Sequence, residues 1–404
     1  MTGPRLIAVL CLAEIASMTG FGSFAALLPA FAESWQLSNT QAGWVNGIYF
    51  GAYMVAVPVL VSLTDRIDPR WVYIVSALAT ALASLGFALL AEGFWSALLL
   101  RAIAGAGLAG TYMPGLKALT DHLPEQLRAR AVAFYTASFS IGSAASFYFT
   151  GELAAWLDWR WAIGLAAAGP VLALLAVLLL VPRATPHAEV RPWAALLDFR
   201  PVLRNRVALG YILAYWSHNW ELFALRSWLV AFLVYAQDLQ AEGALGLDWR
   251  PTSIATLVIM LGLPASVLGN EAAQRFGRRR VVTAVMAASA IIALGIGFSA
   301  PLPFVLIVAF FVLYGITVTG DSASITAGAV AAAQPELRGA TMAAHSFIGF
   351  SGAFLGPLLF GVVLDLAGGA SSGLAWGLAF ASSGLAVALG PLALWFLASS
   401  RADD

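Results

Sequence analysis

The chain has 404 residues, of which 61% are hydrophobic and only 10% are charged. Because soluble domains contain about 25% charged residues, this composition excludes an ordinary soluble protein and indicates a membrane protein with many spans. The 21 basic and 21 acidic residues cancel, so the total charge points to no class of partner, and the single cysteine rules out an internal disulfide bond.

Apolar segments of about 20 residues follow one another along the chain, separated by short polar connections. The expected membrane helices are 5–31, 40–63, 71–91, 94–119, 129–154, 159–182, 207–236, 251–270, 280–299, 302–330, 340–366 and 373–399. The first is too long for the apolar part of a cleavable signal, so we expect it to be retained. The pattern predicts an all-α membrane protein with twelve transmembrane helices.

The longest connection is rich in proline and separates the first six expected helices from the last six. We therefore expect an N-terminal bundle over 1–182, a cytoplasmic linker over 183–206 and a C-terminal bundle over 207–404. The two halves also repeat each other, because "TDRIDPRWV" (64–72) aligns with "AQRFGRRRVV" (273–282). This repeat predicts two pseudo-symmetric six-helix bundles.

The basic residues predict the orientation of the chain. If Arg5 is cytoplasmic, 17 of the 21 basic residues fall in the two termini and the even-numbered connections. Only Arg101, Arg160, Arg226 and Arg250 fall elsewhere. Because basic residues collect in cytoplasmic segments of membrane proteins, we expect both termini in the cytoplasm and a multi-pass protein of the inner or plasma membrane.

Two short motifs stand beside the second and within the fourth expected helix. The connection "VSLTDRIDPR" contains Asp65, Arg66 and Arg70, and "RAIAGAG" begins at Arg101. They resemble the Gly-x-x-x-Asp-Arg-x-Gly-Arg and Arg-x-x-x-Gly-x-Gly motifs of the major facilitator superfamily of secondary transporters, although two loop glycines are replaced. The resemblance covers nearly the whole chain. It implies two six-helix bundles that rock about a central site and expose it to each side in turn.

Two departures from family patterns narrow the range of candidate solutes. In the fifth helix, Ser146 and Phe147 stand where drug/proton antiporters of the family often have Gly-Pro, although the eleventh helix keeps "GAFLGP" (352–357). The second and eighth helices lack the arginines that the nitrate branch typically carries. The resemblance therefore weakens an assignment to drug/proton antiport and makes nitrate a poor candidate.

The expected seventh helix contains polar side chains where lipid-facing sequence would have leucine. His218, Asn219 and Glu221 lie near the bilayer centre, where a charge is costly. His218 and Glu221 are three residues apart and share a helix face, so the pair is suited to take up and release a proton. The alternative is that these residues bond neighbouring helices. Arg226, nearer the outer end, suits a gate, a snorkelling side chain or a substrate contact.

Three further charged residues lie inside expected helices, and each has more than one possible role. Glu14 suits a proton or cation site, as an acid on this helix does in some multidrug members of the family, or a salt bridge across the bundle. Asp321 suits proton coupling or an ion pair with a loop arginine. Arg101 suits binding of an anionic substrate, control of a carboxylate's protonation, or a structural bond between helices.

The resemblance also implies a cytoplasmic gate that closes the inner side of the transporter. Its candidates are Asp65, Arg66, Arg70, Arg275 and His345. At the ends of helices, such charges interact with the helix dipoles and with one another. Breaking that network would be one step of alternating access.

The resemblance places eight helices around a central cavity, and polar residues on them are candidates for substrate contact. They are Arg101, Asn46, Tyr49, Tyr53, Tyr112, Tyr135, Ser138, Asn219 and Arg226. The three on the second helix are spaced three and four apart and therefore form one stripe. The alternative is that such tyrosines are packing or interface residues.

These observations predict a secondary transporter, functional as a monomer, whose partners are a small-molecule substrate, protons and the lipid bilayer. The first hypothesis is proton-coupled uptake of a small organic anion, and the alternative is proton-coupled export of cationic or amphipathic drugs. A non-transporting receptor of the same fold is disfavoured by the gate charges. The sequence has no phosphate-binding loop, metal-ligand cluster or nucleophile-base arrangement, so we expect no enzyme activity, cofactor, metal or nucleic acid.

Overall fold

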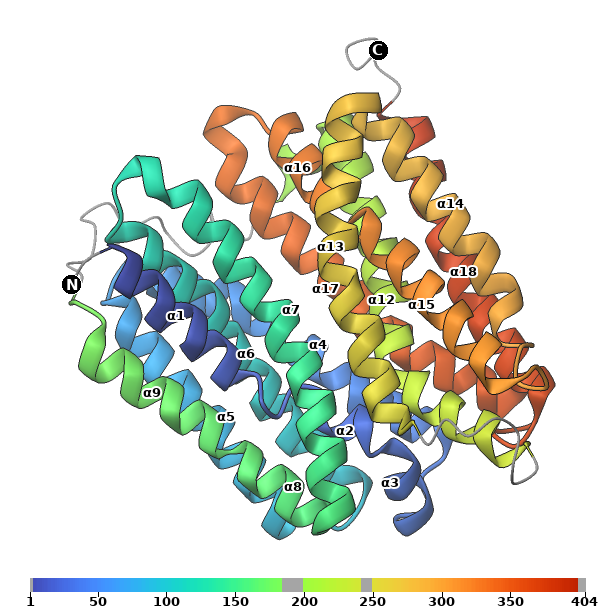
Figure 1. Ribbon diagram of the computed structural model, residues 1–404. Helices are drawn as coiled ribbons and strands as arrows, with labels where there is room; N and C mark the ends of the chain where they lie inside the picture. Colours follow the sequence, from blue (N-terminus) through green and yellow to red (C-terminus); the bar gives the residue numbers. More distant parts are fainter. Residues whose placement is uncertain (1–2, 184–198, 241–248, 399–404) are drawn as a thin grey trace. The chain divides into compact units, whose positions relative to one another are not determined.

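Every regular element in the described part of the chain is a helix (Figure 1). The computed structural model describes residues 3–183, 199–240 and 249–398. The all-helical fold expected from the sequence is therefore confirmed. Most of the expected linker, residues 184–198, lies outside the described residues.

The chain divides into two compact units. Unit 1 comprises Met1–Leu27 and Ile48–Leu196, and unit 2 comprises Leu28–Gly47 and Leu197–Asp404. The helices before the linker are α1 Gly3–Ser17, α2 Ser23–Ala26, α3 Leu28–Ser34, α4 Asn39–Leu63, α5 Pro69–Leu90, α6 Phe94–Asp121, α7 Glu125–Trp156, α8 Trp159–Ala166 and α9 Ala168–Leu180. Those after it are α11 Arg200–Leu203, α12 Arg206–Asp238, α13 Pro251–Phe276, α14 Arg278–Ile296, α15 Phe304–Gly320, α16 Ser322–Ala332, the 3-10 helix η1 Pro335–Leu337, α17 Arg338–Leu366 and α18 Gly373–Leu397.

Helix α4 is shared between the units, because its residues up to Gly47 pack with unit 2 and those from Ile48 pack with unit 1. Its first turn is held by Asp365 at the end of α17. The two carboxylate oxygens accept hydrogen bonds from the backbone and side chain of both Asn39 and Thr40, at 2.6 to 3.1 Å. A carboxylate at a helix N-terminus satisfies free N–H groups and interacts favourably with the helix dipole.

Nine helical segments in the described ranges are long and apolar enough to cross a membrane. Three long segments of the sequence fall outside this set, namely 3–34, 125–156 and 206–238. The first is broken into short helices, and the other two carry more polar side chains. The structure thus confirms a multi-pass helical membrane protein.

Two expected helices are broken in mid-span. The helix predicted over 5–31 ends at Ser17 and restarts at Ser23, and the amide of Gly22 donates to Oγ of Ser146 on α7 at 2.7 Å. A Cβ atom at Gly22 would collide with the ring of Phe147, so the residues that replace Gly-Pro in the fifth helix pack directly on this break. The helix predicted over 302–330 is divided at Asp321 into α15 and α16.

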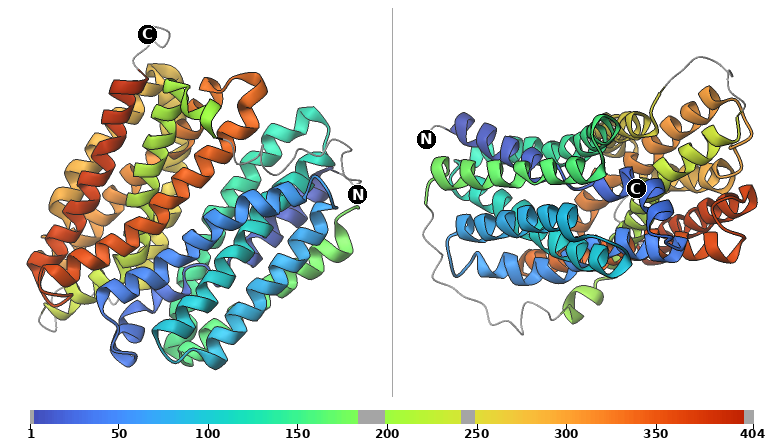
Figure 2. Two further views of the ribbon diagram at one scale, coloured as in Figure 1. Left: turned by 180° about the vertical axis from the view of Figure 1, so that it is seen from behind. Right: turned by 90° about the horizontal axis from the view of Figure 1, so that it is seen from below.

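Each unit has its own packed interior (Figure 2). In unit 1, α5 packs on α6 and α9, and α1 packs on α7 and α9; in unit 2, α12 packs on α17 and α18, and α14 packs on α18. Glycines allow the closest approaches. A Cβ atom at Gly105 of α6 would collide with the carbonyl oxygen of Tyr49, and one at Gly352 of α17 with that of Trp216. Small residues at such crossings let membrane helices come into backbone contact.

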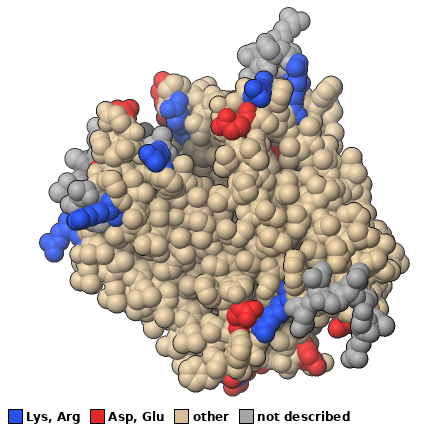
Figure 3. All heavy atoms as spheres, in the orientation of Figure 1, with Lys and Arg blue, Asp and Glu red and all other residues tan. Residues whose placement is uncertain are grey.

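The flanks of the units are apolar. On the face shown in Figure 3, charged side chains gather at the ends of the helices, and the flanks between those ends are uncharged. Large hydrophobic side chains within the helices are exposed, among them Leu82, Leu99 and Ile291. An exposed apolar flank with charges only at its ends is the surface that a lipid bilayer requires.

Candidate functional site

A buried histidine and a buried aspartate meet inside unit 2. Helix α12 carries His218, and the break between α15 and α16 carries Asp321. Nδ1 of His218 lies 2.8 Å from Oδ1 of Asp321, and the two side chains are 1% and 3% exposed. The atoms are close enough for an ion pair when the imidazole is protonated, but they are not aligned for a hydrogen bond. Asp321 therefore lies against a titratable side chain of α12.

Glu221 lies one turn after His218 on α12 and has different partners. Its Oε1 accepts hydrogen bonds from Oγ of Ser289 at 2.9 Å and from the hydroxyl of Tyr314 at 3.0 Å. Within the described residues, no basic side chain forms an ion pair with this carboxyl group. Burying an ionised carboxylate without a cation is costly, so a carboxyl group in this setting is suited to exchange a proton. Ser289 and Tyr314 were not predicted as its partners from the sequence.

An aromatic stack extends the cluster towards α17. The ring of Tyr215 lies parallel to the ring of His345, with centroids 3.9 Å apart, and parallel to His218 at 6.0 Å. Nε2 of His345 is 3.4 Å from Oγ1 of Thr326 on α16. His345 is only 2% exposed, so in this structure it is part of the buried cluster in unit 2.

Several polar atoms of this cluster are buried without a hydrogen bond to any described residue. They are both ring nitrogens of His218, Nδ2 of Asn219, Oδ1 of Asp321, Oγ of Ser324 and Nδ1 of His345. Buried polar atoms are nearly always hydrogen-bonded in native proteins, with ordered water counted among the partners. Because buried polar atoms without a protein partner are commonly satisfied by ordered water or a bound solute, these residues are candidates for a functional site. We define this group, together with Glu221, as the unit 2 cluster.

Unit 1 contains a second buried glutamate. Oε2 of Glu14 accepts a hydrogen bond from the hydroxyl of Tyr135 at 3.1 Å and is 3.5 Å from Oγ of Ser17, while Oε1 is buried without a partner. The ring of Tyr135 stacks on Tyr112 with centroids 5.6 Å apart. The described residues provide no basic partner for Glu14, so its surroundings lack the salt bridge that one sequence-based reading proposed.

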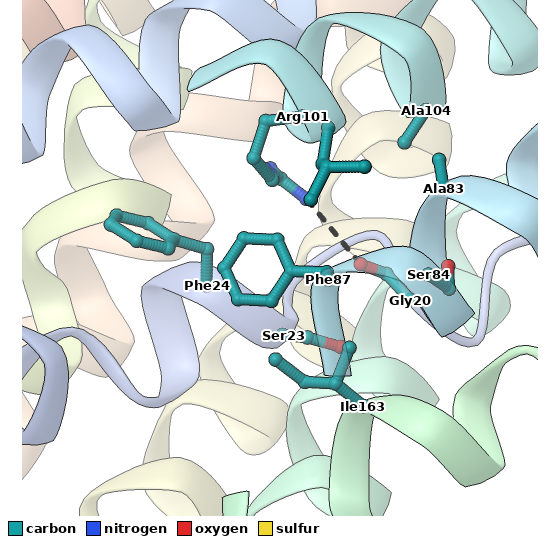
Figure 4. Close-up of a pocket in the computed structure, with 10 residues that line it drawn as sticks. Gly20, Ser23, Phe24, Ala83, Ser84, Phe87, Arg101, Ala104 and Ile163 are labelled. Atoms are coloured by element: carbon teal, nitrogen blue, oxygen red, sulfur yellow. Dashed lines mark hydrogen bonds between the residues drawn. The ribbon is translucent and has the colours of Figure 1, made fainter. Parts of the chain in front are cut away.

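Arg101 contacts the break in the first helix (Figure 4). Its Nη1 donates to the carbonyl oxygens of Phe21 at 3.2 Å and Gly20 at 3.5 Å. Its guanidinium carbon lies 4.2 Å from the centroid of the Tyr49 ring. These contacts match the structural alternative considered from the sequence, because a broken helix leaves carbonyl groups that need donors.

The other substrate-contact candidates are buried. Asn46, Tyr49 and Tyr53 are 2 to 3% exposed, and Asn46 belongs to unit 2 whereas the two tyrosines belong to unit 1. Ser138 donates to the carbonyl oxygen of Phe134 at 2.9 Å. The guanidinium carbon of Arg226 is 5.7 Å from the centroid of the neighbouring Phe223 ring.

In unit 1, the gate candidate Asp65 has a partner, Lys117, that was not among the gate residues predicted from the sequence. Oδ1 of Asp65 lies 3.8 Å from Nζ of Lys117, which also pairs with Asp121 at 3.1 Å. Arg70 instead donates to the carbonyl oxygen of Leu178 at 2.9 Å. Lys117 is the only lysine in the sequence, and this was the one feature of the sequence that could have singled it out as a gate residue.

The two remaining gate candidates, Arg66 and Arg275, lie at helix ends. Arg66 lies at the end of α4, and Arg275 is exposed at the end of α13.

No group of three or more His, Cys, Asp or Glu side chains within the described ranges is arranged to hold a metal ion.

Known proteins with similar sequences include spinster homologs. Human spinster homolog 1 is 26% identical over 254 residues, which are 59% of this chain and 47% of that protein. Human spinster homolog 3 is 26% identical over 288 residues, or 67% of this chain and 56% of that protein. The matched region thus spans about half the length of these relatives.

Solved structures show the same fold. A bacterial homolog of the human lysosomal transporter Spinster, crystallised in an inward-facing and unoccupied conformation, matches with a TM-score of 0.75 and 16% identity. That match covers 98% of this chain and 95% of the other. The nucleoside transporter NupG matches with a TM-score of 0.75 and 15% identity, covering 98% and 100% of the two chains.

The sequence profile of the Major Facilitator Superfamily matches residues 10–247, which is more than half of the chain. The motifs around Asp65 and Arg101 lie inside this range. The all-helical fold, the apolar flanks and the fold neighbours agree with that match. The chain therefore belongs to the major facilitator superfamily of membrane transporters.

Proposed function

We propose that this protein is a secondary active transporter that takes up a small organic anion together with protons by alternating access. The observation that carries the proposal is the unit 2 cluster. It joins two carboxyl groups and two imidazoles from α12, the break between α15 and α16, and α17, and several of its polar atoms are buried without a hydrogen bond to a described residue. Groups of this kind inside membrane proteins mark proton or substrate pathways.

Within the unit 2 cluster, we assign the proton to Glu221, His218 and Asp321. Protonation of the imidazole makes the 2.8 Å contact with Asp321 an ion pair, and its loss removes that attraction. Glu221 is held by two hydroxyl groups, which can hydrogen-bond either form of a carboxyl group. Release of the proton therefore changes the charge of α12 relative to α15 and α16, which is the kind of local change that biases a two-state transporter.

The anionic character of the solute rests on a buried positive charge on the same helix as the proton site. Arg226 follows Glu221 by five residues on α12 and is 9% exposed. We assign it as the counter-charge for the solute. Arg101, the second candidate, already donates to the backbone at the break between α1 and α2. We therefore assign Arg101 to holding that break in position and not to binding the solute.

A second candidate function is proton-coupled export of cationic or amphipathic drugs. One observation favours it. Glu14 is fully buried on α1, next to the stacked rings of Tyr135 and Tyr112 and without a described basic partner, and such an acid can pair with a cation. The loss of Gly-Pro at Ser146 and Phe147 favours uptake instead.

The membrane arrangement is part of the proposal. We infer twelve spans in two six-helix bundles, over 1–182 and 207–404, with the segments around α1 to α3, α7 and α12 crossing the membrane in addition to the nine apolar ones. Both termini and the linker over 183–206 would face the cytoplasm, and the protein would act as a monomer in the inner or plasma membrane. Asp65, Arg66, Arg70, Arg275 and Lys117 would then lie at the cytoplasmic gate.

The proposal is tested by uptake into proteoliposomes that contain the purified protein. A panel of small carboxylates, amino acids, sugars, nucleosides and cationic drugs is offered with and without an inwardly directed proton gradient. We expect the gradient to accelerate uptake of a carboxylate, and Glu221→Gln to remove that acceleration. The exposed acid Glu271 provides a matched control, because Glu271→Gln should leave the acceleration intact. Acceleration of cation export alone would replace the first function by the second, and gradient-driven uptake by Glu221→Gln would end the proton assignment.

A further inference from the structure

A small cavity in unit 1 lies beside Arg101 (Figure 4). Its volume is about 20 Å³, and its walls include Gly20, Ser23, Ser84, Phe87 and Arg101. A cavity of roughly one water-sized sphere is enough for a single water molecule or a monatomic ion. It is too small for the organic solute of the proposed transport reaction, so its ligand is a different species.

The positive charge of Arg101 has no acidic partner in the part of the chain that the structure describes. The side chain is 6% exposed, it contacts two carbonyl oxygens and the Tyr49 ring, and its Nε is buried without an acceptor. Carbonyl dipoles and an aromatic face attract a cation but leave its full charge in place. An uncompensated buried charge is costly, so an anion at this position would stabilise the fold.

The polar groups around the cavity are those that bind a halide. The hydroxyl of Ser84 hydrogen-bonds to no other described residue, and Oγ of Ser23 is 3.1 Å from Oγ1 of Thr150, where either can donate. The carbonyl oxygen of Gly20 already accepts from Arg101. Hydroxyl and guanidinium donors with apolar walls, and without a carboxylate, suit an anion and not a metal cation.

We propose that the cavity beside Arg101 binds one monatomic anion of the chloride type. The anion would neutralise Arg101 and fix the guanidinium that holds the break between α1 and α2. The site is independent of the proposed transport reaction, because none of its residues belongs to the unit 2 cluster.

The experiment uses the purified full-length protein and needs no transported solute. Thermal unfolding is followed in sodium chloride, sodium bromide and sodium gluconate at equal ionic strength. We expect chloride and bromide to raise the unfolding temperature in a saturable way relative to gluconate, whose anion is too large for the cavity. Bromide should also give an anomalous diffraction peak within hydrogen-bond distance of Arg101.

Variants separate a specific site from a general salt effect. Arg101→Gln should lose the difference between chloride and gluconate, and the exposed Arg160 gives the control Arg160→Gln, which should keep it. If Arg101→Gln does not fold, Ser84→Val serves, because it fills the cavity and removes a donor and should raise the half-saturating chloride concentration roughly tenfold or more. Equal unfolding temperatures of the unmodified protein in all three salts, or an unchanged chloride effect in Ser84→Val, would mean that the cavity holds only water and would overturn the proposal.

Discussion

The two buried glutamates, Glu14 in unit 1 and Glu221 in unit 2, have similar hydroxyl partners but different neighbours. Each lies on the first long helix of its half of the sequence and is at most 1% exposed. Each accepts a tyrosine hydroxyl, from Tyr135 at 3.1 Å and from Tyr314 at 3.0 Å. One turn away from Glu221, however, His218 contacts a second acid.

From this difference we infer a division of labour between the units, in which unit 2 exchanges the transported proton. In unit 1, Glu14 has hydroxyl partners, and no histidine or second carboxyl group among the described residues pairs with it. In unit 2, the contact between His218 and Asp321 links α12 to the break between α15 and α16, and under the proposed function it offers the proton a second position. We therefore expect mutations in unit 2 to uncouple transport from protons and the matching mutations in unit 1 to have weaker effects.

The largest expected effect is that of Asp321→Asn. Removing the negative charge leaves the imidazolium of His218 without its counter-ion, so proton-driven accumulation of the solute should fall by about 100-fold or more, as for removal of an essential acid or base. Exchange of labelled solute between the two sides should persist, because it requires no net proton movement. Flux assays in proteoliposomes measure both, with the exposed Asp238 supplying Asp238→Asn as the control. Unimpaired accumulation by Asp321→Asn would show that the pair is structural.

A smaller effect is expected for Glu14→Gln, which tests unit 1 directly. The amide can still accept from Tyr135 and adds a donor at the unpartnered Oε1 position, so we expect a loss of at most about tenfold in net uptake, or about 1.4 kcal/mol. The same flux assay applies, with Glu221→Gln measured beside it. If Glu14→Gln uncouples protons as completely as Glu221→Gln, the division of labour is wrong and the export hypothesis gains support.

The smallest effects are expected for Tyr135→Phe and Tyr314→Phe. Each removes one hydrogen bond to a buried carboxyl group, which typically contributes about 1 kcal/mol or somewhat more to stability. Both variants should therefore unfold at slightly lower temperatures. Only Tyr314→Phe should also move the pH profile of uptake, because only its partner is assigned to proton exchange. A shifted profile in Tyr135→Phe alone would reverse the comparison.

Much of the fold could be predicted because it depends on local composition. The length of an apolar segment decides whether it can span a bilayer, and the segment expected over 71–91, for example, is found as α5 over Pro69–Leu90. The breaks at 18–22 and Asp321 were missed. A glycine or a single acid inside an apolar run does not end a helix by itself, and both breaks depend on partners from other helices, such as Ser146 for Gly22.

The contacts of the candidate site were harder to predict, because they too depend on partners from other helices. Spacing on α12 placed His218 and Glu221 on one face, but their partners lie on α14, α15 and the break at Asp321. Which residues meet across helices depends on how each helix is rotated and placed, and the hydrophobic pattern of nearly uniformly apolar helices carries little of that information. The contact between Asp65 and Lys117 was missed in the same way.

The central claim is that unit 2, and not unit 1, exchanges the transported proton. The most direct test adds the transported solute to purified protein in weakly buffered solution and follows proton uptake or release with a pH-sensitive dye. We predict a pH change for the unmodified protein and for Glu14→Gln, and none for Glu221→Gln, with solute binding verified in all three. A pH change that disappears in Glu14→Gln and survives in Glu221→Gln would contradict the account.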